Sequence, residues 1–393
     1  MKFFHLSDLH IGKVVNRFPM LAEQRHVFEQ VIGYIKTERP AAVIIAGDVY
    51  DRAIPSVEAV RLFDDFLTEL AGEDVAVVIV SGNHDSPERM NYANRLLSDK
   101  KLFLCGSFEG KLQKLVLGDE HGEVNFWLLP FVKPLSVRGL FGDREIESYG
   151  DAVSAILENA DIDYASRNVL VSHQYYTKAG VAAMRSESEL SPLGGLDAID
   201  SGLIERFDYV ALGHLHGAQS VGLPHIRYAG SPVKYSFSEW RQEKSVSLVE
   251  LGEKGKLDIT PLPLTPIHDM REIRGEIDKL MGGDGGADKE DYLRVILTDE
   301  EEIIDPMGKL RSVYPNVMCL DFDNSRTRID ISAIAGAGVA ATGTGTEKAE
   351  RLSPYDLFTE FFLDTQGATM TDEQAAIVRG LLADNVMEME EDA

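Results

Sequence analysis

Five short apolar runs along the chain each stop at residues of the types that bind metal ions. The clearest run covers residues 77–80, is made of valine and isoleucine, and leads into Ser81, Gly82, Asn83, His84 and Asp85. A short β-branched run bounded by glycine is typical of a strand buried on both faces. The other four runs end near Asp8 and His10, near Asp48, at His173, and near His214 and His216.

Two segments in which apolar residues recur at helical spacing lie between the first three of these runs. Residues 21–39 place Val27, Val31 and Ile35 on one face, and residues 56–70 do the same with Val60, Phe63, Leu67 and Leu70. Alternating strands and helices favour an α/β fold with a parallel sheet. Because parallel strands end at one edge, where ligands bind in open α/β sheets, the polar residues are expected to meet there.

The metal-binding candidates supply nitrogen and oxygen atoms and no thiolate: Asp8, His10, Asp48, Asn83, His173, His214 and His216. This donor set favours Mn, Fe or Zn over a soft-metal site and argues against an all-oxygen Ca or Mg cage. These are too many ligands for one tetrahedral ion, so we expect two metals that share a carboxylate, with Asp48 as the natural bridge. Such a pair activates water and neutralises phosphate oxygens, which is the chemistry of phosphate-ester hydrolysis.

His84 follows the ligand candidate Asn83 and is able to point toward a substrate instead. There it would stabilise developing charge or protonate the leaving oxygen. Asp51 or Asp85 would fix the orientation of its ring. The alternative for each aspartate is a cap within its own loop.

Composition sets limits on the function class. The formal net charge of −26 argues against a free-standing, non-specific nucleic-acid binder. Cys105 and Cys319 are far apart and in no metal or redox spacing, which fits a reducing cytoplasm. We find no secretory signal at the N-terminus and no apolar run long enough to span a bilayer, so we expect a cytoplasmic protein with no membrane contact.

Prolines at 261, 263 and 266 mark a domain boundary. We expect a first domain over residues 1–265 and a small α/β domain over 266–332, with a helix at 272–280 and strands at 292–297 and 317–322. Residues 333–350 have the Ala/Gly/Thr-rich composition of a flexible linker. Residues 351–393 predict two amphipathic helices and an acidic end, with a capping box at Thr371. We favour docking of this helix pair on a partner; the alternative is that it folds back onto the main body.

The ordered motifs resemble the calcineurin-like metallophosphoesterase superfamily: Asp8-x-His10, Gly47-Asp48-x-x-Asp51, Gly82-Asn83-His84-Asp85, His173 and Gly213-His214-x-His216. Longer stretches at 5–12, 82–89 and 228–237 are similar to the members of that superfamily that serve as nuclease subunits beside a coiled-coil ATPase. The resemblance implies a four-layer α/β/β/α sandwich, a small α/β capping domain, and a C-terminal helix pair that docks on the ATPase.

The resemblance also implies roles for individual residues. One Mn²⁺ would be held by Asp8, His10, Asp48 and His216, the other by Asp48, Asn83, His173 and His214, with His84 catalytic; other divalent metals would also suit. It implies a homodimer within a heterotetramer, with 21–39 and 56–70 as candidate interface helices, although the core explains their apolar faces equally well. Candidates for contact with DNA phosphate, or else ordinary surface charges, are Arg52, Arg89, Lys133 and Lys234.

The expected function is therefore a Mn-dependent DNA nuclease. In complex with its ATPase it would act as an ATP-dependent double-strand exonuclease and a single-strand endonuclease, in DNA repair, replication and recombination. The alternative is a stand-alone two-metal phosphodiesterase for a small nucleotide or phosphodiester. The second domain and the tethered helices favour the nuclease, and a complete motif set argues against a non-enzymatic scaffold.

Overall fold

The computed structural model describes most of the chain in two compact units, Met1–Arg271 and Glu272–Ala393. The described residues are 1–92, 94–142, 144–178, 185–189, 198–284, 288–325 and 327, and isolated positions between 355 and 378. The linker expected at 333–350, and most of the region expected to form the helix pair, lie outside the described residues.

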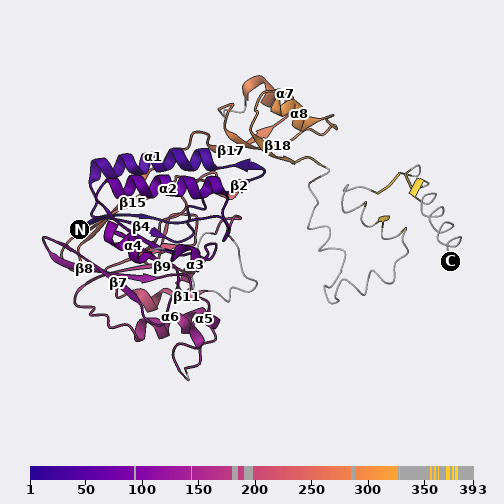
Figure 1. Cartoon of the computed structure of the whole chain (residues 1–393). Helices are drawn as coiled ribbons and strands as arrows, with labels where there is room; N and C mark the ends of the chain where they lie inside the picture. The colour runs from indigo at the N-terminus through magenta and orange to yellow at the C-terminus, as the bar shows by residue number, and fades with distance from the viewer. Residues whose placement is uncertain are drawn as a thin grey trace. The chain divides into compact units, whose positions relative to one another are not determined.

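Two six-stranded sheets form the centre of the first unit (Figure 1). The first sheet has the order β16 (Leu257–Pro263), β15 (Ser245–Leu251), β1 (Lys2–Leu6), β4 (Ala42–Ala46), β5 (Ala76–Val80) and β6 (Leu102–Cys105). Strands β1, β4, β5 and β6 run parallel, and β15 and β16 are antiparallel additions. The parallel order β1–β4–β5 confirms the alternation of strands and helices predicted from the sequence.

The second sheet has the order β13 (Gln219–Val221), β14 (Leu223–Tyr228), β12 (Tyr209–Gly213), β9 (Arg167–His173), β8 (Gly122–Leu129) and β7 (Gln113–Asp119). Its four central strands are parallel, and an antiparallel strand pairs at each edge. All five strands that were expected to end in polar residues are therefore present, but β9 and β12 lie in a different sheet from β1, β4 and β5.

The two sheets face each other across an apolar core. Strand β8 shows how the pleat builds it: Phe126 and Leu128 point between the sheets, whereas Trp127 and Leu129 point to the opposite face. Residues from the first sheet that fill the same inter-sheet layer are Phe3, Ala42, Ile44, Ala46, Ala76, Val78, Val80, Cys105, Val249 and Leu251. Both sheets are thus covered on both faces, which explains their nearly continuous apolar strands.

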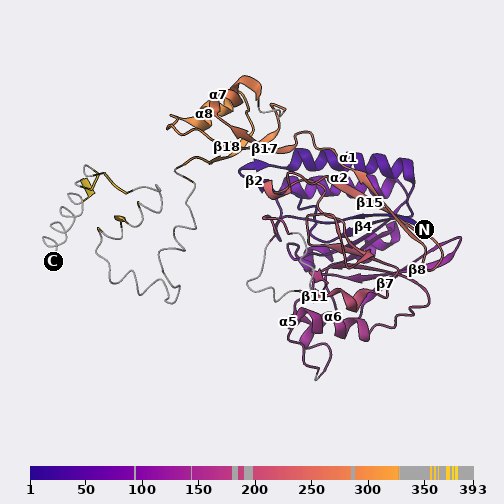
Figure 2. The same cartoon turned by 180° about the vertical axis from the view of Figure 1, so that it is seen from behind.

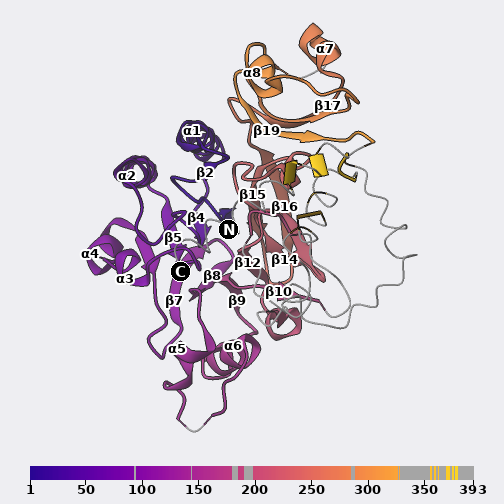
Figure 3. The same cartoon turned by 90° about the vertical axis from the view of Figure 1, so that its right-hand side faces the viewer.

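Helices cover the outer face of each sheet, as the views in Figures 1, 2 and 3 agree. Helices α1 (Leu21–Glu38) and α2 (Val57–Gly72) lie on the first sheet and pack together through stacked Phe28 and Phe66 rings, 4.5 Å between centroids. Helices α5 (Pro134–Arg138) and α6 (Tyr149–Glu158) lie on the second. The result is the expected four-layer α/β/β/α sandwich. Among the described residues, no helix is both long and apolar enough to cross a membrane.

The short elements complete the first unit. They are β2 (Val14–Val15), β3 (Phe18–Pro19), α3 (Pro87–Met90), α4 (Asn94–Leu97), β10 (Tyr176–Thr177) and β11 (Ile199–Asp200), with 3-10 turns at Ser98–Lys100, Ser201–Ile204 and Phe237–Glu239. Helix α2 begins after Ser56, whose hydroxyl accepts the Ala59 N–H. Its buried face runs through Leu62, Phe63 and Phe66. Val60, expected on that face, is 45% exposed.

A three-stranded sheet in the order β17 (Met270–Gly275), β18 (Tyr292–Leu297) and β19 (Val317–Phe322) belongs to the second unit, apart from the first two residues of β17. This unit also holds α7 (Ile277–Lys279), a π turn at Leu280–Asp284 and α8 (Pro306–Arg311). The strands at 292–297 and 317–322 confirm the prediction. The helix expected at 272–280 is wrong in its first half, because pairing with β18 draws residues up to Gly275 into a strand and overrides their local helix propensity.

Little of the C-terminal region is described. The capping box expected at Thr371 is present: the Thr371 N–H donates to the Gln374 side chain at 2.9 Å, and the Gln374 N–H donates to the Thr371 hydroxyl at 3.3 Å.

Candidate metal centre

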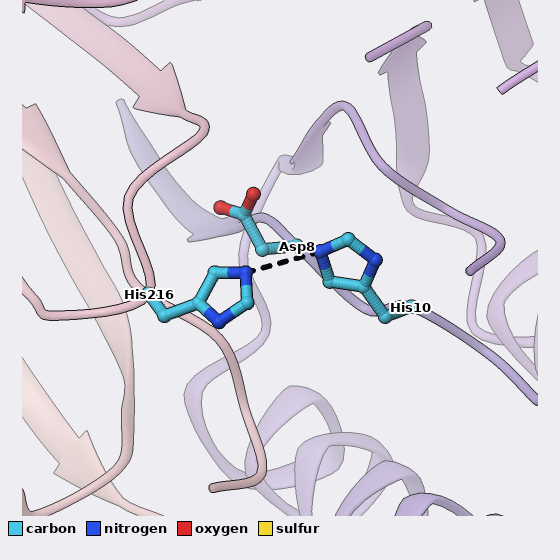
Figure 4. Close-up of side chains that lie close together, drawn as sticks. All are labelled: Asp8, His10 and His216. Atoms are coloured by element: carbon cyan, nitrogen blue, oxygen red, sulfur yellow. Dashed lines mark hydrogen bonds between the residues drawn. The ribbon is translucent and has the colours of Figure 1, made fainter. Parts of the chain in front are cut away.

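The loops at the carboxyl ends of β1, β4, β5, β9 and β12 bring together the residues singled out from the sequence. Three overlapping groups have nitrogen and oxygen atoms within 4.8 Å of one another: Asp8, His10 and His216; Asp8, Asp48 and His173; and His10, Asp48 and His84. Figure 4 shows the first of these groups, with the rings of His10 and His216 approaching each other beside the Asp8 carboxylate. Donors from both sheets therefore meet at one place.

Unusual backbone geometry aims these side chains. Asp8, His10, Asp48 and His214 all have positive φ, at 51°, 42°, 50° and 111°. Such conformations cost a non-glycine residue about 1–3 kcal/mol each and gather at functional sites. Backbone hydrogen bonds hold two of the turns together, from Asp8 N–H to Gly47 O at 3.0 Å and from His10 N–H to Asp48 O at 2.9 Å.

Two glycines are needed because segments of the backbone approach each other so closely at the site. A Cβ on Gly213, at the end of β12, would lie 1.9 Å from the Ala46 carbonyl oxygen of the facing sheet. A Cβ on Gly82 would lie 2.1 Å from Oδ1 of Asp48. Neither position has space for any side chain. Gly213 therefore allows the two sheets to approach each other, and Gly82 allows the loops after β4 and β5 to approach within the first sheet.

The first set of donors consists of Asp8, His10, Asp48 and His216, which follow β1, β4 and β12 and are all buried. The Nε2 atoms of His10 and His216 lie 3.1 Å apart, and Nε2 of His10 is 3.6 Å from Oδ2 of Asp48. The Asp8 carboxylate accepts the backbone N–H of His214 at 3.0 Å. The Nδ1 atom of His216 has its own oxygen partners, which leaves Nε2 directed at His10.

The second set of donors shares Asp48 with the first and adds Asn83, His173 and His214, at the ends of β5, β9 and β12. The Oδ1 atom of Asn83 is 3.1 Å from Nε2 of His173 and 3.0 Å from Nδ1 of His214. Nε2 of His173 is also 3.3 Å from Oδ2 of Asp48. The Nδ1 atom of His173 donates to the Ala46 carbonyl at 2.7 Å, so Nε2 is the nitrogen of this ring that faces the site.

These distances fit divalent cations. Ligand atoms bound at about 2.0–2.2 Å to one ion lie roughly 3 Å from each other, as the donors do in both sets. His10 has a buried Nδ1 with no hydrogen-bond partner among the described residues, and its Nε2 faces the other donors. Asp48 contacts both sets, which is the position of a shared carboxylate. The side chains gathered here are electron-pair donors, as a cation requires.

Burial and neighbouring charge tune the protonation of these groups. Burial lowers the pKa of His10 well below its usual value, and burial together with the nearby His173 lowers that of His214 to about 3, so both rings are neutral at pH 7. Burial would raise the pKa of Asp48, but His173 outweighs it and holds this pKa well below its usual range. Against its own burial, His173 has a pKa raised to about 9 by Asp48. A cation bound here would replace that proton.

His84 lies at the more open side of the site. Its Nδ1 contacts the backbone carbonyl of Asp51 at 2.8 Å, and its ring meets the ring of His10 edge-on at 4.8 Å. The backbone N–H of His84 donates to Oδ1 of Asp48 at 2.9 Å. The Asp51 side chain is bonded instead to Lys13, at 2.8 Å. Asp51 therefore holds the His84 ring through its main chain.

Asp85 connects two loops of the site. Its carboxylate accepts the backbone N–H groups of Val49, Tyr50 and Gly82 at 3.1, 3.0 and 2.9 Å. Burial and the neighbouring Asp48 raise its pKa to about 6. Asp85 thus fixes the Asp48 loop against the Asn83 loop, and it makes no contact with the His84 ring among the hydrogen bonds described.

The four candidate DNA contacts differ in their surroundings. Arg52 is 79% exposed, and Arg89 and Lys133 are also exposed. Lys234 is only 11% exposed, and its ammonium is bonded to Asp269 at 2.7 Å and to the Trp240 carbonyl at 2.8 Å. An ammonium held in this way is not available to a phosphate, so we retain Arg52, Arg89 and Lys133 as candidates.

Several residues around the site were missed by sequence reasoning. Tyr235 packs against the rings of His10 and His216 at 5.7 and 5.8 Å, and Gln24 on α1 bonds the Leu9 and His10 carbonyls. Glu239 stands behind His216. The only signal in the sequence is their place near polar motifs, since these contacts join segments far apart along the chain.

The four-layer sandwich and the histidine–aspartate cluster at its strand ends define a metal-dependent phosphoester hydrolase. The profile of the family described as "Calcineurin-like phosphoesterase" matches residues 1–218, and that of "Type 5 capsule protein repressor C-terminal domain" matches residues 266–366. The chain is 33% identical to SbcD, a component of the nuclease SbcCD, from Staphylococcus epidermidis over 332 residues, 83% of this chain and 87% of that protein. The chain therefore belongs to the calcineurin-like phosphoesterases and, within them, to the SbcD family.

Two solved structures also overlap with the chain. One is a phosphopantetheinyl hydrolase from Mycobacterium tuberculosis, with a TM-score of 0.36 and 16% identity over 61% of this chain and 91% of that one. The other is a dimetal phosphatase from Danio rerio, with a TM-score of 0.38 and 12% identity over 68% of this chain and 99% of that one.

Proposed function

We propose that this chain is a Mn²⁺-dependent DNA nuclease that acts with an SbcC-type coiled-coil ATPase. In that complex it cuts double-stranded DNA as an ATP-dependent exonuclease and single-stranded DNA as an endonuclease, in repair, replication and recombination in the cytoplasm. The observation that carries the proposal is the convergence of nitrogen and oxygen donors from both sheets around Asp48. Membership of the SbcD family supports DNA as the substrate.

The donor sets suggest how the site works. We assign Asp8, His10, Asp48 and His216 to one Mn²⁺ and Asp48, Asn83, His173 and His214 to a second. Two bound ions would supply Lewis-acid activation of water and neutralise the phosphate oxygens. His84, whose ring is held by the Asp51 carbonyl at 2.8 Å, stabilises developing charge or donates a proton to the leaving oxygen. Arg52, Arg89 and Lys133 position the phosphate backbone.

The direct test is degradation of a short linear DNA duplex by the purified chain in Mn²⁺, with and without the ATPase and ATP. We expect cleavage that needs Mn²⁺, and that acquires ATP dependence on long or end-blocked DNA when the partner is present. No cleavage of any DNA, together with rapid hydrolysis of a small phosphodiester, would instead identify a stand-alone phosphodiesterase with the same centre.

We propose that residues 351–393 bind the ATPase. The capping box at Thr371 supports a helix start there, and Phe358 and Ile377 are exposed by 40% and 62%. Deletion of 351–393 is expected to abolish co-purification with the ATPase and to leave Mn²⁺ binding and cleavage of short DNA unchanged, because the metal centre lies within the first unit. Normal complex formation by the truncated chain would contradict the assignment.

We further propose that the chain forms a homodimer within the nuclease–ATPase heterotetramer. A cavity of about 570 Å³ lies beside α2, and its lining includes Val60, Phe63, Met90 and Tyr92. Tyr92 is 82% exposed, and Ile54, which lies in the sequence between the lining residues Ala53 and Pro55, is 74% exposed. Exposed apolar groups of this kind mark protein interfaces. Tyr92→Asp is expected to convert a dimeric mass to a monomeric one in sedimentation equilibrium; a monomeric wild type would contradict the proposal.

A further inference from the structure

A buried polar network stands behind the metal-ligand candidate His216. The Nδ1 atom of His216 lies 2.8 Å from the Ser188 hydroxyl oxygen and 3.3 Å from Oε1 of Glu239. The Ser188 hydroxyl donates to the same Oε1 at 2.7 Å. Glu239 is fully buried. A carboxylate therefore contacts His216 at the ring nitrogen opposite the one that faces His10, both directly and through a serine hydroxyl.

His173, one of the two histidines of the other donor set, has a different partner behind its ring. The Nδ1 atom of His173 donates to a neutral carbonyl, that of Ala46, at 2.7 Å. Both rings thus present Nε2 to the site, but only His216 has a carboxylate behind it. A carboxylate that accepts the N–H of a ligating imidazole fixes its tautomer and orientation and makes the other nitrogen a stronger ligand. The two donor sets are therefore chemically unequal.

We propose that Glu239 is a positioning residue that makes the donor set of His216 bind its divalent cation more tightly than the donor set of His173. This inference rests on the ligand sets given under the proposed function. Glu239 acts only through the imidazole of His216: it accepts the Nδ1–H and so keeps the Nε2 lone pair directed into the site. Ser188 strengthens the contact by bridging the two groups.

Lys244 is what allows a carboxylate to stand in this position. Its ammonium lies 2.7 Å from Glu239, and it also donates to the His216 carbonyl at 2.9 Å and to the Ser231 hydroxyl at 3.0 Å. Lys244 is 7% exposed, so the pair is buried together. A buried charge without its partner is strongly unfavourable. A substitution that removes only Glu239 would therefore strand Lys244 and disturb the fold as well as the metal site.

The test is a calorimetric titration of the full chain with Mn²⁺, using the charge-balanced double variant Glu239→Gln/Lys244→Met. In the wild type we expect two unequal binding events. In the double variant the tighter event should weaken by about 10- to 100-fold, with the weaker event unchanged. Ser188→Ala should weaken the tighter event by less, because Glu239 remains within 3.3 Å of the ring.

A matched control separates positioning from loss of packing. Glu23 is as deeply buried as Glu239 but accepts the Ile267 N–H and contacts the His268 ring, both at 2.7 Å. Glu23→Gln should lower the unfolding temperature without changing either Mn²⁺ affinity. A folded double variant with an unchanged tighter event, or with both events weakened equally, would overturn the inference. A wild type that binds no Mn²⁺ would instead overturn the proposed function.

Discussion

Replacement of His84 by alanine is expected to slow DNA cleavage by about 10²- to 10⁴-fold, the usual contribution of a positioned acid or base. The Mn²⁺ content should stay at the wild-type level, because the Asn83, His173 and His214 donors contact one another without it. The measurements are a single-turnover cleavage rate and metal analysis of the purified variant, made side by side on one preparation.

The matched control is His121→Ala, which removes a histidine in the turn between β7 and β8 that is bonded to neither donor set. It should cleave DNA at the wild-type rate. The metal analysis decides the role of His84, whose ring atoms lie within 4.8 Å of donors on His10 and Asp48. If His84→Ala loses both ions, His84 is a ligand and the catalytic assignment is wrong.

Asp48→Asn is expected to have the larger effect, with cleavage reduced to background and both Mn²⁺ ions lost. The Oδ2 atom of Asp48 is the only carboxylate oxygen described within 4 Å of both His10 and His173, so its charge serves both donor sets. A ligand at a hundred times its dissociation constant stabilises a fold by about 2.7 kcal/mol. The rise in unfolding temperature that Mn²⁺ gives the wild type should therefore disappear.

Asp65→Asn serves as the control for Asp48→Asn, since Asp65 is a 55% exposed aspartate on α2 that pairs with Arg25. It should retain both the cleavage rate and the Mn²⁺-dependent rise in unfolding temperature. Retention of one tightly bound ion by Asp48→Asn would show that Asp48 belongs to a single donor set and does not bridge.

The strands and the polar residues that follow them were predictable because the residue types of a buried strand and of a metal ligand can be recognised within a few positions of the sequence. The short β-branched runs at 43–46 and 77–80 are buried on both faces. The sequence indicates this because apolar residues follow one another there and do not alternate with polar ones. The glycines beside Asp48 and Asn83 likewise indicate that two segments of the chain approach each other closely. Features that depend on one short segment and its own neighbours were therefore open to sequence reasoning.

Other features depend on contacts between distant segments. Nothing local to β9 or β12 indicates that they leave the sheet of β1, and the helix expected at 272–280 gave way to pairing with β18. The buried face of α2 differs from the predicted one. Val60 and Phe66 both fit a helical stripe of apolar residues, and only packing in the folded protein decides which of them is buried. Glu239 reaches His216 through a turn with no periodic pattern, so no spacing rule identifies it.

The division of the donors between two sheets has a consequence for the protein's tolerance of change. The first sheet carries the donors Asp8, His10, Asp48 and Asn83 at its strand ends, whereas the second carries His173, His214 and His216. A slip of one sheet across the other by a fraction of an ångström would therefore pull both donor sets apart, even with every ligand unchanged. Phe126 and Tyr209, whose rings both pack on Phe3 at 5.6 Å, hold that alignment. The apolar layer between the sheets therefore determines how well the two halves of each donor set fit together, and substitutions in that layer are expected to weaken metal binding.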